Sequence, residues 1–480
     1  MLNLSIISLP ASPISSITLD SPPFAVLTSD SLLGALLYLD PGTGSLLFSV
    51  IIGIVSTAYF IVKDLLYRVG TRMRMLASPN SSKSTNASLH TEYAAVFYSE
   101  GKQYETTFGP LLEHIAHSKT RCLYLSNEPD DPLLKWISDQ NNPLLHADCI
   151  GSGHMAWARL RTLRANLVCM TTPGLDVMQI RRSPHVRHYM HIVHSPTDKS
   201  FNRPYSFDHF DSVVINGPHQ QRVIRHLESL RGRKTKALFT VGCIYYDRFV
   251  SRYDVALKRF NEAGAMSASR PLWILLAPTW GRNGLLRRYG IDLIRSIAEG
   301  NMEIVIRPHP QSVKSESKLI NELQNSTARL GNCRWDFSSD PVHAMAASDI
   351  LISDISGIVF DYAFVTGRPV LTMDFTVDKR GFEAMDLPFE PWEITSLEQI
   401  GRRITVEDIS QLQSIIQEEI GSKTRATQIT RLRDEYVVNF GGASKAAAEL
   451  IVQIADFGMQ QHQAPEAYQL SIEVHATTRS

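Results

Sequence analysis

The stretch ASDILISDISGIVFDYA, which runs from Ala347 to Ala363, decides the fold of this chain. It opens with an apolar run, Ile350–Ser353, that has the length of a buried strand. The turn Asp354–Gly357 follows, and an apolar helical pattern comes directly after it. A short strand rich in Ile and Leu that leads straight into a helix is typical of a parallel sheet covered by helices.

The same alternation of short apolar strands and longer amphipathic helices recurs on both sides of this stretch. Two such series predict the α/β class, with one Rossmann-like domain at residues 93–250 and another at 251–460. The expected strands are Ala94–Tyr98, Arg121–Leu125, Leu145–Ile150, Asn166–Met170, Tyr189–Val193, Ser212–Ile215, Ala237–Val241, Leu272–Ala277, Met302–Arg307, Ile350–Ser353 and Pro369–Met373.

The segment at residues 1–75 differs from the rest, because no charged residue occurs between Pro41 and Val62. About 20 apolar residues span a bilayer as a helix, so we predict a single transmembrane helix at about 41–62. The alternative is a buried core helix. A Ser/Asn-rich linker at 76–92 follows, and residues 461–480 have the composition of a loose tail.

The charges around this apolar run predict its orientation. Only acidic residues precede it, whereas basic residues follow it. By the positive-inside rule, the protein is then a single-pass protein of the cell membrane with its catalytic part in the cytoplasm. The flanking charges are Asp20, Asp30 and Asp40 before the run, and Lys63, Arg68, Arg72 and Arg74 after it.

Composition argues against several classes of protein. Lys+Arg and Asp+Glu both count 48, and this balance does not fit a general nucleic-acid-binding protein. The five cysteines form no C-x-x-C pair, which is typical of reduced thiols rather than a zinc ribbon. Four histidines recur three residues apart, a spacing that suits neither a helical nor a strand metal site, so no metal is expected. They are His185, His188, His191 and His194.

Polar residues follow three of the predicted strands of the second domain. The strand before Asp354–Gly357 is one, IVIRPHPQS (Ile304–Ser312) contains another, and LLAPTWGRN (Leu275–Asn283) contains the third. Carboxyl ends of parallel strands meet at one edge of a sheet, where ligands of open α/β folds bind. A helix N-terminus at this edge offers free N–H groups to a phosphate, and a glycine there lets the ligand approach the backbone.

Together these ends predict one pocket that contains hydroxyls, a cation, an imidazole and a helix N-terminus. Such a pocket suits a nucleotide diphosphate in outline. Taken singly, the turn could be a plain Ser-capped strand-to-helix connection and the histidine could be structural. The predicted residues are Thr279, Arg307, His309, Asp354, Ser356 and Gly357.

The motifs APTW, R-P-H-P and SD-x-S-G-x-x-FDYA, in this order and spacing, resemble the CDP-glycerol glycerophosphotransferase family. RPVLTMDF (Arg368–Phe375) is similar to the strand that follows in that family. In the first domain, HIVHSPTDK (His191–Lys199) is similar to the family's W-H-G-x-x-x-K segment and places His194 at its histidine. FDSVVINGPHQ (Phe210–Gln220) and VGCIYYD (Val241–Asp247) come next, as the resemblance leads us to expect.

The resemblance implies a GT-B-like fold, in which two Rossmann-like domains face a cleft. It also implies transfer of glycerol phosphate, or a related polyol phosphate, from a CDP-linked donor to a hydroxyl of a teichoic-acid-type polymer or lipid-linked acceptor, with release of CMP. No cofactor is implied, and the partners are the nucleotide donor, the acceptor and the membrane.

The roles that follow are expectations of the same kind. His194 would be the general base, and His309 would bind donor phosphate or assist the leaving group. Asp361 could contact ribose or polyol hydroxyls, or simply be a first-turn helix acid. The residues expected to bind the donor are Thr279, Arg307, Ser353, Asp354, Ser356, Gly357 and Asp361.

Departures from the family pattern leave alternatives open. Ser195 stands where the family has Gly, and Ile355 replaces an aromatic residue. A GT-B glycosyltransferase that uses a UDP- or GDP-sugar would share the turn at Asp354–Gly357. A membrane-anchored, non-catalytic partner in polymer export is the other alternative.

The membrane prediction can be tested by deletion. Removing residues 1–75 should release a soluble protein, because the only predicted span is then absent. Cell fractionation measures this, and a reporter fused after Arg74 measures the orientation. A reporter that is active only outside the cytoplasmic membrane would contradict the orientation, and a truncated chain that stays with the membrane would show that its body also binds lipid.

Overall fold

The computed structural model describes residues 92–262, 270–298, 302–373 and 377–457. The predicted membrane span at 41–62 and the predicted tail at 461–480 lie outside these residues. Among the residues that are described, no helix combines the length and the apolar character needed to cross a bilayer.

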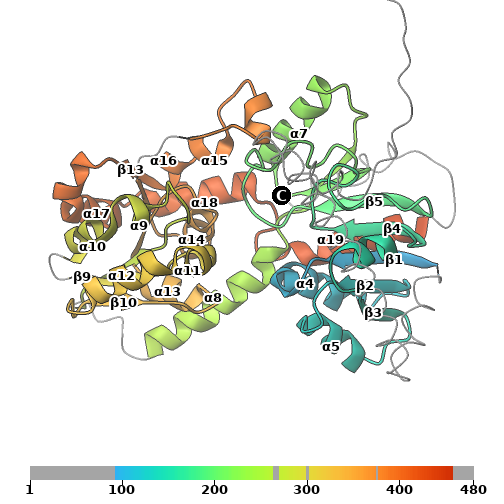
Figure 1. Cartoon of the computed structure of the whole chain (residues 1–480), viewed down its shortest axis with the longest axis horizontal. Helices are drawn as coiled ribbons and strands as arrows, with labels where there is room; N and C mark the ends of the chain where they lie inside the picture. The colour runs from blue at the N-terminus through green and yellow to red at the C-terminus, as the bar shows by residue number, and fades with distance from the viewer. Residues whose placement is uncertain (1–91, 263–269, 299–301, 374–376, 458–480) are drawn as a thin grey trace, which may run out of the picture. The chain divides into compact units, whose positions relative to one another are not determined.

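The N-terminal half contains a seven-stranded sheet in the order β3-β2-β1-β4-β5-β6-β7, in which all neighbouring strands are parallel (Figure 1). Its order reverses between β1 and β4, as in Rossmann folds. The strands are β1 (Tyr93–Ser99), β2 (Cys122–Ser126), β3 (Leu145–Cys149), β4 (Ala165–Met170), β5 (Val186–Ile192), β6 (Ser212–Ile215) and β7 (Ala237–Thr240). The helices are η1 (Lys102–Tyr104), α4 (Glu105–Ile115), α5 (Pro132–Asp139), α6 (His154–Leu160) and α7 (Pro218–Leu230).

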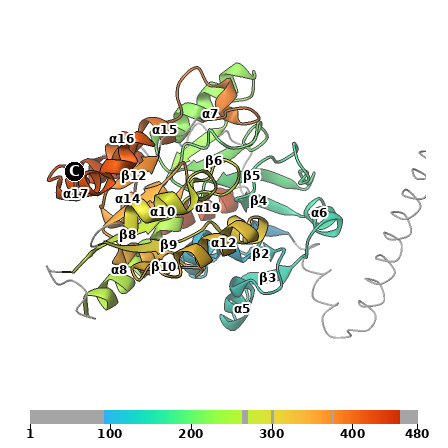
Figure 2. The ribbon, with the colours of Figure 1, turned by 60° about the vertical axis from the view of Figure 1, so that its left-hand side comes forward.

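The C-terminal half repeats this plan with six parallel strands in the order β10-β9-β8-β11-β12-β13. Helices α10 and α12 pack together over the β8–β9 side of this sheet (Figure 2). The strands are β8 (Leu272–Leu276), β9 (Met302–Ile306), β10 (Cys333–Trp335), β11 (Ile350–Ser353), β12 (Val370–Met373) and β13 (Gly401–Ile404). The helices are α8 (Tyr245–Glu262), α9 (Leu285–Arg288), α10 (Gly290–Ala298), α11 (Pro310–Ser315), α12 (Ser317–Thr327), α13 (Val342–Ala347), α14 (Ile358–Thr366), η2 (Glu383–Asp386), α15 (Trp392–Thr395), α16 (Leu397–Ile400), η3 (Glu407–Gln411), α17 (Leu412–Gly421), α18 (Arg425–Tyr436) and α19 (Ala443–Phe457).

Each sheet is buried on both faces. Successive residues of a strand point to opposite sides, so alternate residues enter different apolar clusters. In β1, Ala95 and Phe97 enter one apolar cluster with α4 and α19, whereas Val96 and Tyr98 enter the cluster on the other face. The sheet of the C-terminal half is divided in the same way between two clusters. The predicted α/β class with two parallel sheets is therefore confirmed.

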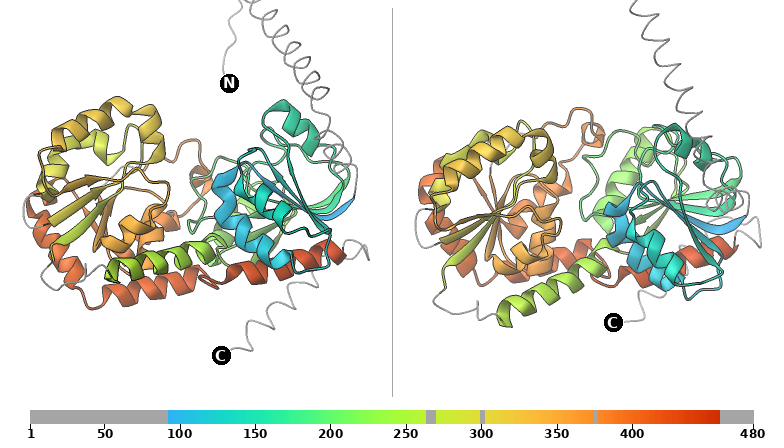
Figure 3. Two further views of the ribbon diagram at one scale, coloured as in Figure 1. Left: turned by 90° about the horizontal axis from the view of Figure 1, so that it is seen from below. Right: turned by 60° about the horizontal axis from the view of Figure 1, so that its bottom comes forward.

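Helix α19 lies near the end of the described residues and packs against the N-terminal sheet. Its residues fall in the range 251–460 predicted for the donor domain, but Ala447 and Ile451 belong to the apolar cluster of the N-terminal sheet. The side chain of Asn166 in β4 donates to the carbonyl of Ala455 at 3.0 Å. Figure 3 shows the red C-terminal helix against the blue and cyan elements of the N-terminal half.

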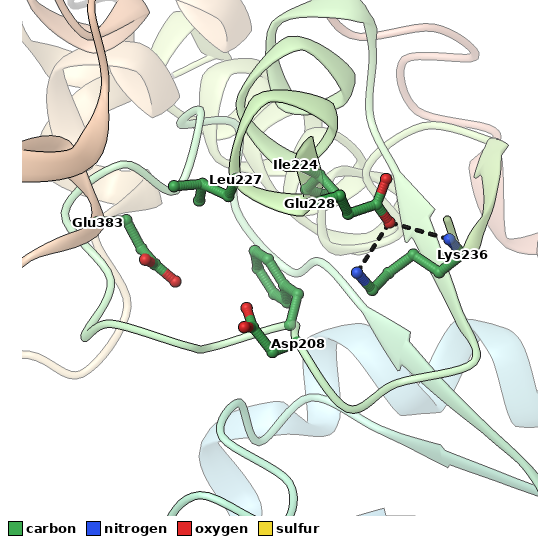
Figure 4. Close-up of a pocket in the computed structure, with 7 residues that line it drawn as sticks. Asp208, Ile224, Leu227, Glu228, Lys236 and Glu383 are labelled. Carbon is green, nitrogen blue, oxygen red and sulfur yellow. Dashed lines mark hydrogen bonds and ion pairs between the residues drawn. The ribbon is translucent and has the colours of Figure 1, made fainter. Parts of the chain in front are cut away.

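Ion pairs between η2 and the N-terminal half form a second connection between the two halves. The Arg231 guanidinium, which is mostly buried, donates to the carboxylates of Asp208 and Glu383. Beside them, Lys236 donates to Glu228 through both its backbone N–H and its ammonium group (Figure 4). A cavity of about 10 Å³, enough for roughly one water molecule, is lined by Phe207, Asp208, Ile224, Leu227, Glu228, Lys236 and Glu383. A cavity of this size cannot hold a nucleotide, so the residues around it have a structural role.

The end of α18 lies close to the backbone of Gly217, which precedes α7. A Cβ at Gly217 would lie 2.2 Å from the backbone carbonyl oxygen of Tyr436, at the end of α18. We therefore expect Gly217→Ala to lower the free energy of unfolding by about 1–3 kcal/mol, the usual cost of overpacking, measured by urea denaturation. Gly331→Ala is the matched control, since nothing lies within 4 Å of its added Cβ. Equal stability of the two variants would contradict this account of Gly217.

Candidate active site

The three polar strand ends predicted from the sequence meet at one edge of the C-terminal sheet. Strands β9, β8 and β11 are direct neighbours in that sheet. The backbone N–H of Thr279, after β8, donates to Asp354, after β11, at 2.7 Å. Trp280 and His309, which follow β8 and β9, have ring centroids 6.5 Å apart. The predicted juxtaposition of the three motifs is therefore present.

Asp354 organises this edge rather than projecting from it. Its side chain belongs to a residue that is only 2% exposed. One carboxylate oxygen accepts from the N–H of Thr279 and the other accepts from the N–H of Leu285 at 3.1 Å. Burial raises the pKa of Asp354 to about 6, although these two hydrogen bonds act in the opposite direction. Both oxygens are used to hold the loop between β8 and α9, so a role in positioning is favoured over contact with donor hydroxyls.

Glu316 holds the same loop from its other side. Its carboxylate accepts from the backbone N–H of Gly281 at 3.1 Å and from the hydroxyl of Ser312 at 3.0 Å, and it also pairs with Arg287. These contacts keep the pKa of Glu316 below its ordinary value although burial raises it. Sequence reasoning missed this residue, because a lone Glu between two helices carries no motif.

Ser353 and Arg307, two of the predicted donor-binding residues, have partners within the protein. The buried Ser353 hydroxyl donates to the carbonyl of Ala277 at 2.7 Å, which ties β11 to the end of β8. The Arg307 guanidinium donates to Asp336 at 2.5 Å and to the carbonyl of Ser338 at 2.7 Å. These contacts give both side chains structural roles, and their predicted contacts with the donor stay predictions.

The start of α14 has the character expected of a phosphate site. Gly357 is exposed, and a Cβ built on it would meet nothing within 4 Å. Ser356 is partly exposed in the turn before it, and no side chain caps the helix. The N–H groups at a helix start carry the positive end of its dipole, although in α14 those of Val359 and Phe360 already donate to the carbonyls of Ser356 and Gly357. This turn can therefore accept an anionic oxygen close to the backbone.

His309 caps a helix, a role that its sequence context did not reveal. Its Nδ1 accepts from the backbone N–H of Gln311 at 3.0 Å, which makes it the N-cap of α11. Burial lowers the pKa of His309, so the neutral ring is favoured, and with Nδ1 as acceptor its proton is on Nε2. The ring can thus donate a hydrogen bond from Nε2, as the predicted contact with donor phosphate requires.

His194 lies in the N-terminal half, in the loop that follows β5. Burial, with Lys199 and His191 acting in the same direction, holds the pKa of His194 well below its usual value. The Tyr104 ring meets it edge-on, with centroids 5.2 Å apart. A neutral imidazole at pH 7 is able to accept a proton, as a general base must.

The loop after His194 is held by its carbonyl groups. The side chain of Asn216 donates to the carbonyl of Ser195 at 2.6 Å, and that of Gln220 donates to the carbonyl of Thr197 at 2.7 Å. His219 Nε2 lies 2.7 Å from the carbonyl oxygen of Pro196. These three side chains come from the motif NGPHQ, whose physical role is therefore to fix the backbone beside His194.

Lys199 connects this loop electrostatically to α14. Its backbone has a φ of 67°, which is uncommon for a residue other than glycine, and its ammonium donates to the Ser195 hydroxyl at 2.6 Å. Burial lowers the pKa of Lys199, whereas Glu393, Asp198 and Asp361 act against that change. Lys199 was part of the recognised segment, but sequence reasoning gave it no role.

Asp361 takes part in the same group of charges. Its carboxylate accepts from the Tyr246 hydroxyl at 2.9 Å. Burial raises the pKa of Asp361 to about 7, while Tyr246 and Lys199 lower it. The predicted contact of Asp361 with donor hydroxyls stays a prediction beside this structural role.

A direct contact between the two halves lies nearby. Asp198 accepts a hydrogen bond from the backbone N–H of Trp392 at 2.6 Å.

The other histidines of the regular series face separate surroundings. His188 Nε2 lies 2.7 Å from the Ser212 hydroxyl. The His191 ring packs against Phe207 and Phe210, with centroids 4.9 and 5.1 Å away, and burial lowers its pKa to about 3. His188 and His191 are three residues apart in β5, so they point to opposite faces of the sheet and have different surroundings.

The cap geometry predicts a separation of two roles for His309. Asn is a good N-cap, whereas Ala is not, so His309→Ala should lose about 1 kcal/mol of stability that His309→Asn retains. If Nε2 donates to the donor, both variants should bind CDP-glycerol about 2–10-fold more weakly, the effect of one lost hydrogen bond. Melting temperature and calorimetric affinity measure the two effects. Normal donor binding by His309→Asn would leave His309 with the cap alone.

Comparisons with known proteins agree with the motifs. Residues 185–390 match the family model described as CDP-Glycerol:Poly(glycerophosphate) glycerophosphotransferase. Comparison with curated proteins finds no matching sequence.

Comparison with solved structures finds several that resemble part of this chain. The wall teichoic acid polymerase TagF is 17% identical, with 76% of this chain and 90% of that chain covered and a TM-score of 0.49. A UDP-GlcNAc 2-epimerase from Methanocaldococcus jannaschii is 14% identical, with coverages of 76% and 100% and a TM-score of 0.47. A glycosyltransferase from Rickettsia africae is 12% identical, with coverages of 78% and 100% and a TM-score of 0.46.

The matched residues include His194, the three strand-end motifs and the start of α14. The resemblance predicted from the sequence is confirmed over residues 185–390, which are similar to the CDP-glycerol glycerophosphotransferase family.

Proposed function

We propose that this protein transfers glycerol phosphate, or a related polyol phosphate, from a CDP-linked donor to a hydroxyl of a cell-surface polymer or lipid-linked acceptor. The observation that carries the proposal is the edge of the C-terminal sheet, where Asp354 fixes the loop after β8 beside the open start of α14. That edge presents helix N–H groups and a fixed loop to one anionic ligand.

His194 supports the acceptor side of the proposal. A hydroxyl is a poor nucleophile at neutral pH, and a neutral imidazole can remove its proton. Burial keeps this imidazole neutral, and the side chains of Asn216 and Gln220 fix the loop beside it. We therefore assign the role of general base to His194, whose neutral ring lies beside a loop that these side chains fix.

In the proposed reaction, the acceptor oxygen attacks the β-phosphorus of the donor. The new P–O bond forms while the bond from that phosphorus to the bridging oxygen of CMP breaks, and the hydroxyl proton passes to His194. The N–H groups at the start of α14 and the His309 Nε2–H donate to phosphate oxygens. Catalysis then consists of positioning and charge stabilisation, and no metal or cofactor is part of the proposal.

The place of the reaction is also a proposal. The apolar run at 41–62 and the basic residues after it support a single-pass anchor with the catalytic part in the cytoplasm. A lipid-linked acceptor would be reached from there. A sugar transferase and a non-catalytic export partner are the competing functions, and the following experiment separates all three.

The test is nucleotide release by the purified full-length protein with CDP-glycerol, CDP-ribitol, UDP-glucose and GDP-mannose, each with and without a glycerol phosphate oligomer. We expect acceptor-dependent release of CMP alone. Release of UDP or GDP would favour the sugar transferase, and donor binding with no release of any nucleotide would favour the non-catalytic partner.

The same assay with His194→Ala tests the base. Turnover should fall by roughly 10²–10⁴ with little change in donor affinity, as expected for loss of a general base. His188→Ala is the matched control, because that side chain lies in β5 and bonds Ser212 of the neighbouring strand β6. Near-normal turnover in a well-folded His194→Ala protein would end the assignment.

A further inference from the structure

A group of polar side chains lies at the carboxyl edge of the N-terminal sheet, where the strand order reverses between β1 and β4. Glu100 follows β1, and Thr171 and Thr172 follow β4. Tyr98 pairs with Met170 in the sheet register, so these residues continue side by side beyond the paired strands. Ligands of open parallel sheets bind at such a reversal, yet the proposed donor contacts leave this one unused.

Two hydroxyls at this position lack hydrogen-bond partners. Thr171 and Thr172 are 0% and 9% exposed, and in the described part of the protein neither Oγ1 has a partner. A buried polar atom without a partner is costly, and native proteins rarely leave one unexplained. A ligand that bonds these hydroxyls would remove that cost.

The surrounding groups are close enough to influence one another. Burial raises the pKa of Tyr98 to about 12, and Glu100 and Tyr104 add to the effect. Burial also raises the pKa of Glu100, whereas the neighbouring Thr172 hydroxyl acts in the opposite direction. The ring of Tyr104 in turn contacts that of His194, whose Nδ1 also has no partner among the described residues. The polar group thus adjoins the proposed general base.

The chemistry of these groups selects a class of ligand. Hydroxyl, phenol and carboxyl groups bond well to the hydroxyls of a polyol, whereas a phosphate would be repelled by Glu100. The nearby cation Lys102 is exposed and already bonded to Asp130 at 2.5 Å. An uncharged polyol unit therefore fits this position better than a phosphate.

We propose that Glu100, Tyr104 and Thr172 form a subsite for the terminal, uncharged polyol unit of the acceptor and hold its hydroxyl against His194. This rests on the proposed function and names the part of the acceptor that the N-terminal half recognises. The donor phosphates stay at the C-terminal sheet, and the subsite governs only the acceptor.

Thr172→Val provides the sharpest test, because it keeps the shape of the side chain and removes only the hydroxyl. The probe is a synthetic glycerol phosphate trimer with a free glycerol end, titrated by calorimetry into the full-length protein in nanodiscs. We expect Thr172→Val to bind it about 2–10-fold more weakly and Glu100→Gln roughly 10–100-fold more weakly, as for neutral and charged hydrogen bonds. CDP-glycerol affinity should not change.

The melting temperature distinguishes a ligand-binding role of the Thr172 hydroxyl from a structural role. Among the described residues the Thr172 hydroxyl makes no hydrogen bond, and its effect is on the pKa of Glu100. We therefore expect Thr172→Val to leave the melting temperature unchanged and Thr172→Ser to restore trimer binding. Thr162→Val, at the opposite edge of the sheet, is the control and should leave trimer binding unchanged. A lowered melting temperature in Thr172→Val would favour a purely structural hydroxyl.

The outcomes distinguish this inference from the proposed function. Unchanged trimer affinity in both Thr172→Val and Glu100→Gln, or no trimer binding by the unmodified protein, would overturn the subsite even if CMP is released. Conversely, trimer binding that weakens in both variants supports the subsite even if CDP-glycerol yields no CMP, a result that would overturn only the proposed transfer reaction.

Discussion

Every described strand runs parallel to its neighbours in both sheets, and the chemistry of the molecule depends on this one constraint. Parallel pairing sends all carboxyl ends of a sheet to the same edge. Residues far apart in the sequence, such as Thr279 and Asp354, thereby become hydrogen-bonded neighbours. In the N-terminal half the same constraint places Thr172 and His194 at one edge of the sheet, because they follow the neighbouring strands β4 and β5.

The motif residues divide into two kinds once their partners are known. Asp354, Ser353 and Arg307 bond to backbone or side-chain groups of the protein and hold the edge in shape, as does Glu316 outside the motifs. The start of α14 and the exposed Gly357 are the parts that remain open to a ligand. A motif therefore includes residues that support the shape of a site as well as positions that are open to a ligand.

Strong periodicity explains which parts of the fold were predictable. Buried central strands such as β8 and β11 are continuous apolar runs, and both were predicted from the sequence. Strands β10 and β13 were missed, because each lies at a sheet edge, pairs on one side only and contains arginine, as in Arg334 and Arg402. Their sequences, CRW and GRRI, carry too little alternation to indicate a strand.

The site was predictable where chemistry and strand ends coincided, and not where tertiary contacts assign the role. The cap made by His309 and the carbonyl contacts of Asn216 and Gln220 depend on partners that single-sequence patterns do not reveal. The positive φ of Lys199 has the same origin. Such roles become visible only when the distances between atoms are known.

The return of α19 to the N-terminal sheet has a consequence for how the protein is made. Ala447, Ile451 and Ala455 complete the apolar layer that covers β1 and β4, yet they lie near the end of the described chain. A ribosome releases the N-terminal strands long before these residues emerge from it. The half that is synthesised first therefore lacks part of the cover on one face of its sheet until Ala443–Phe457 have been made, although α4 covers another part of that face.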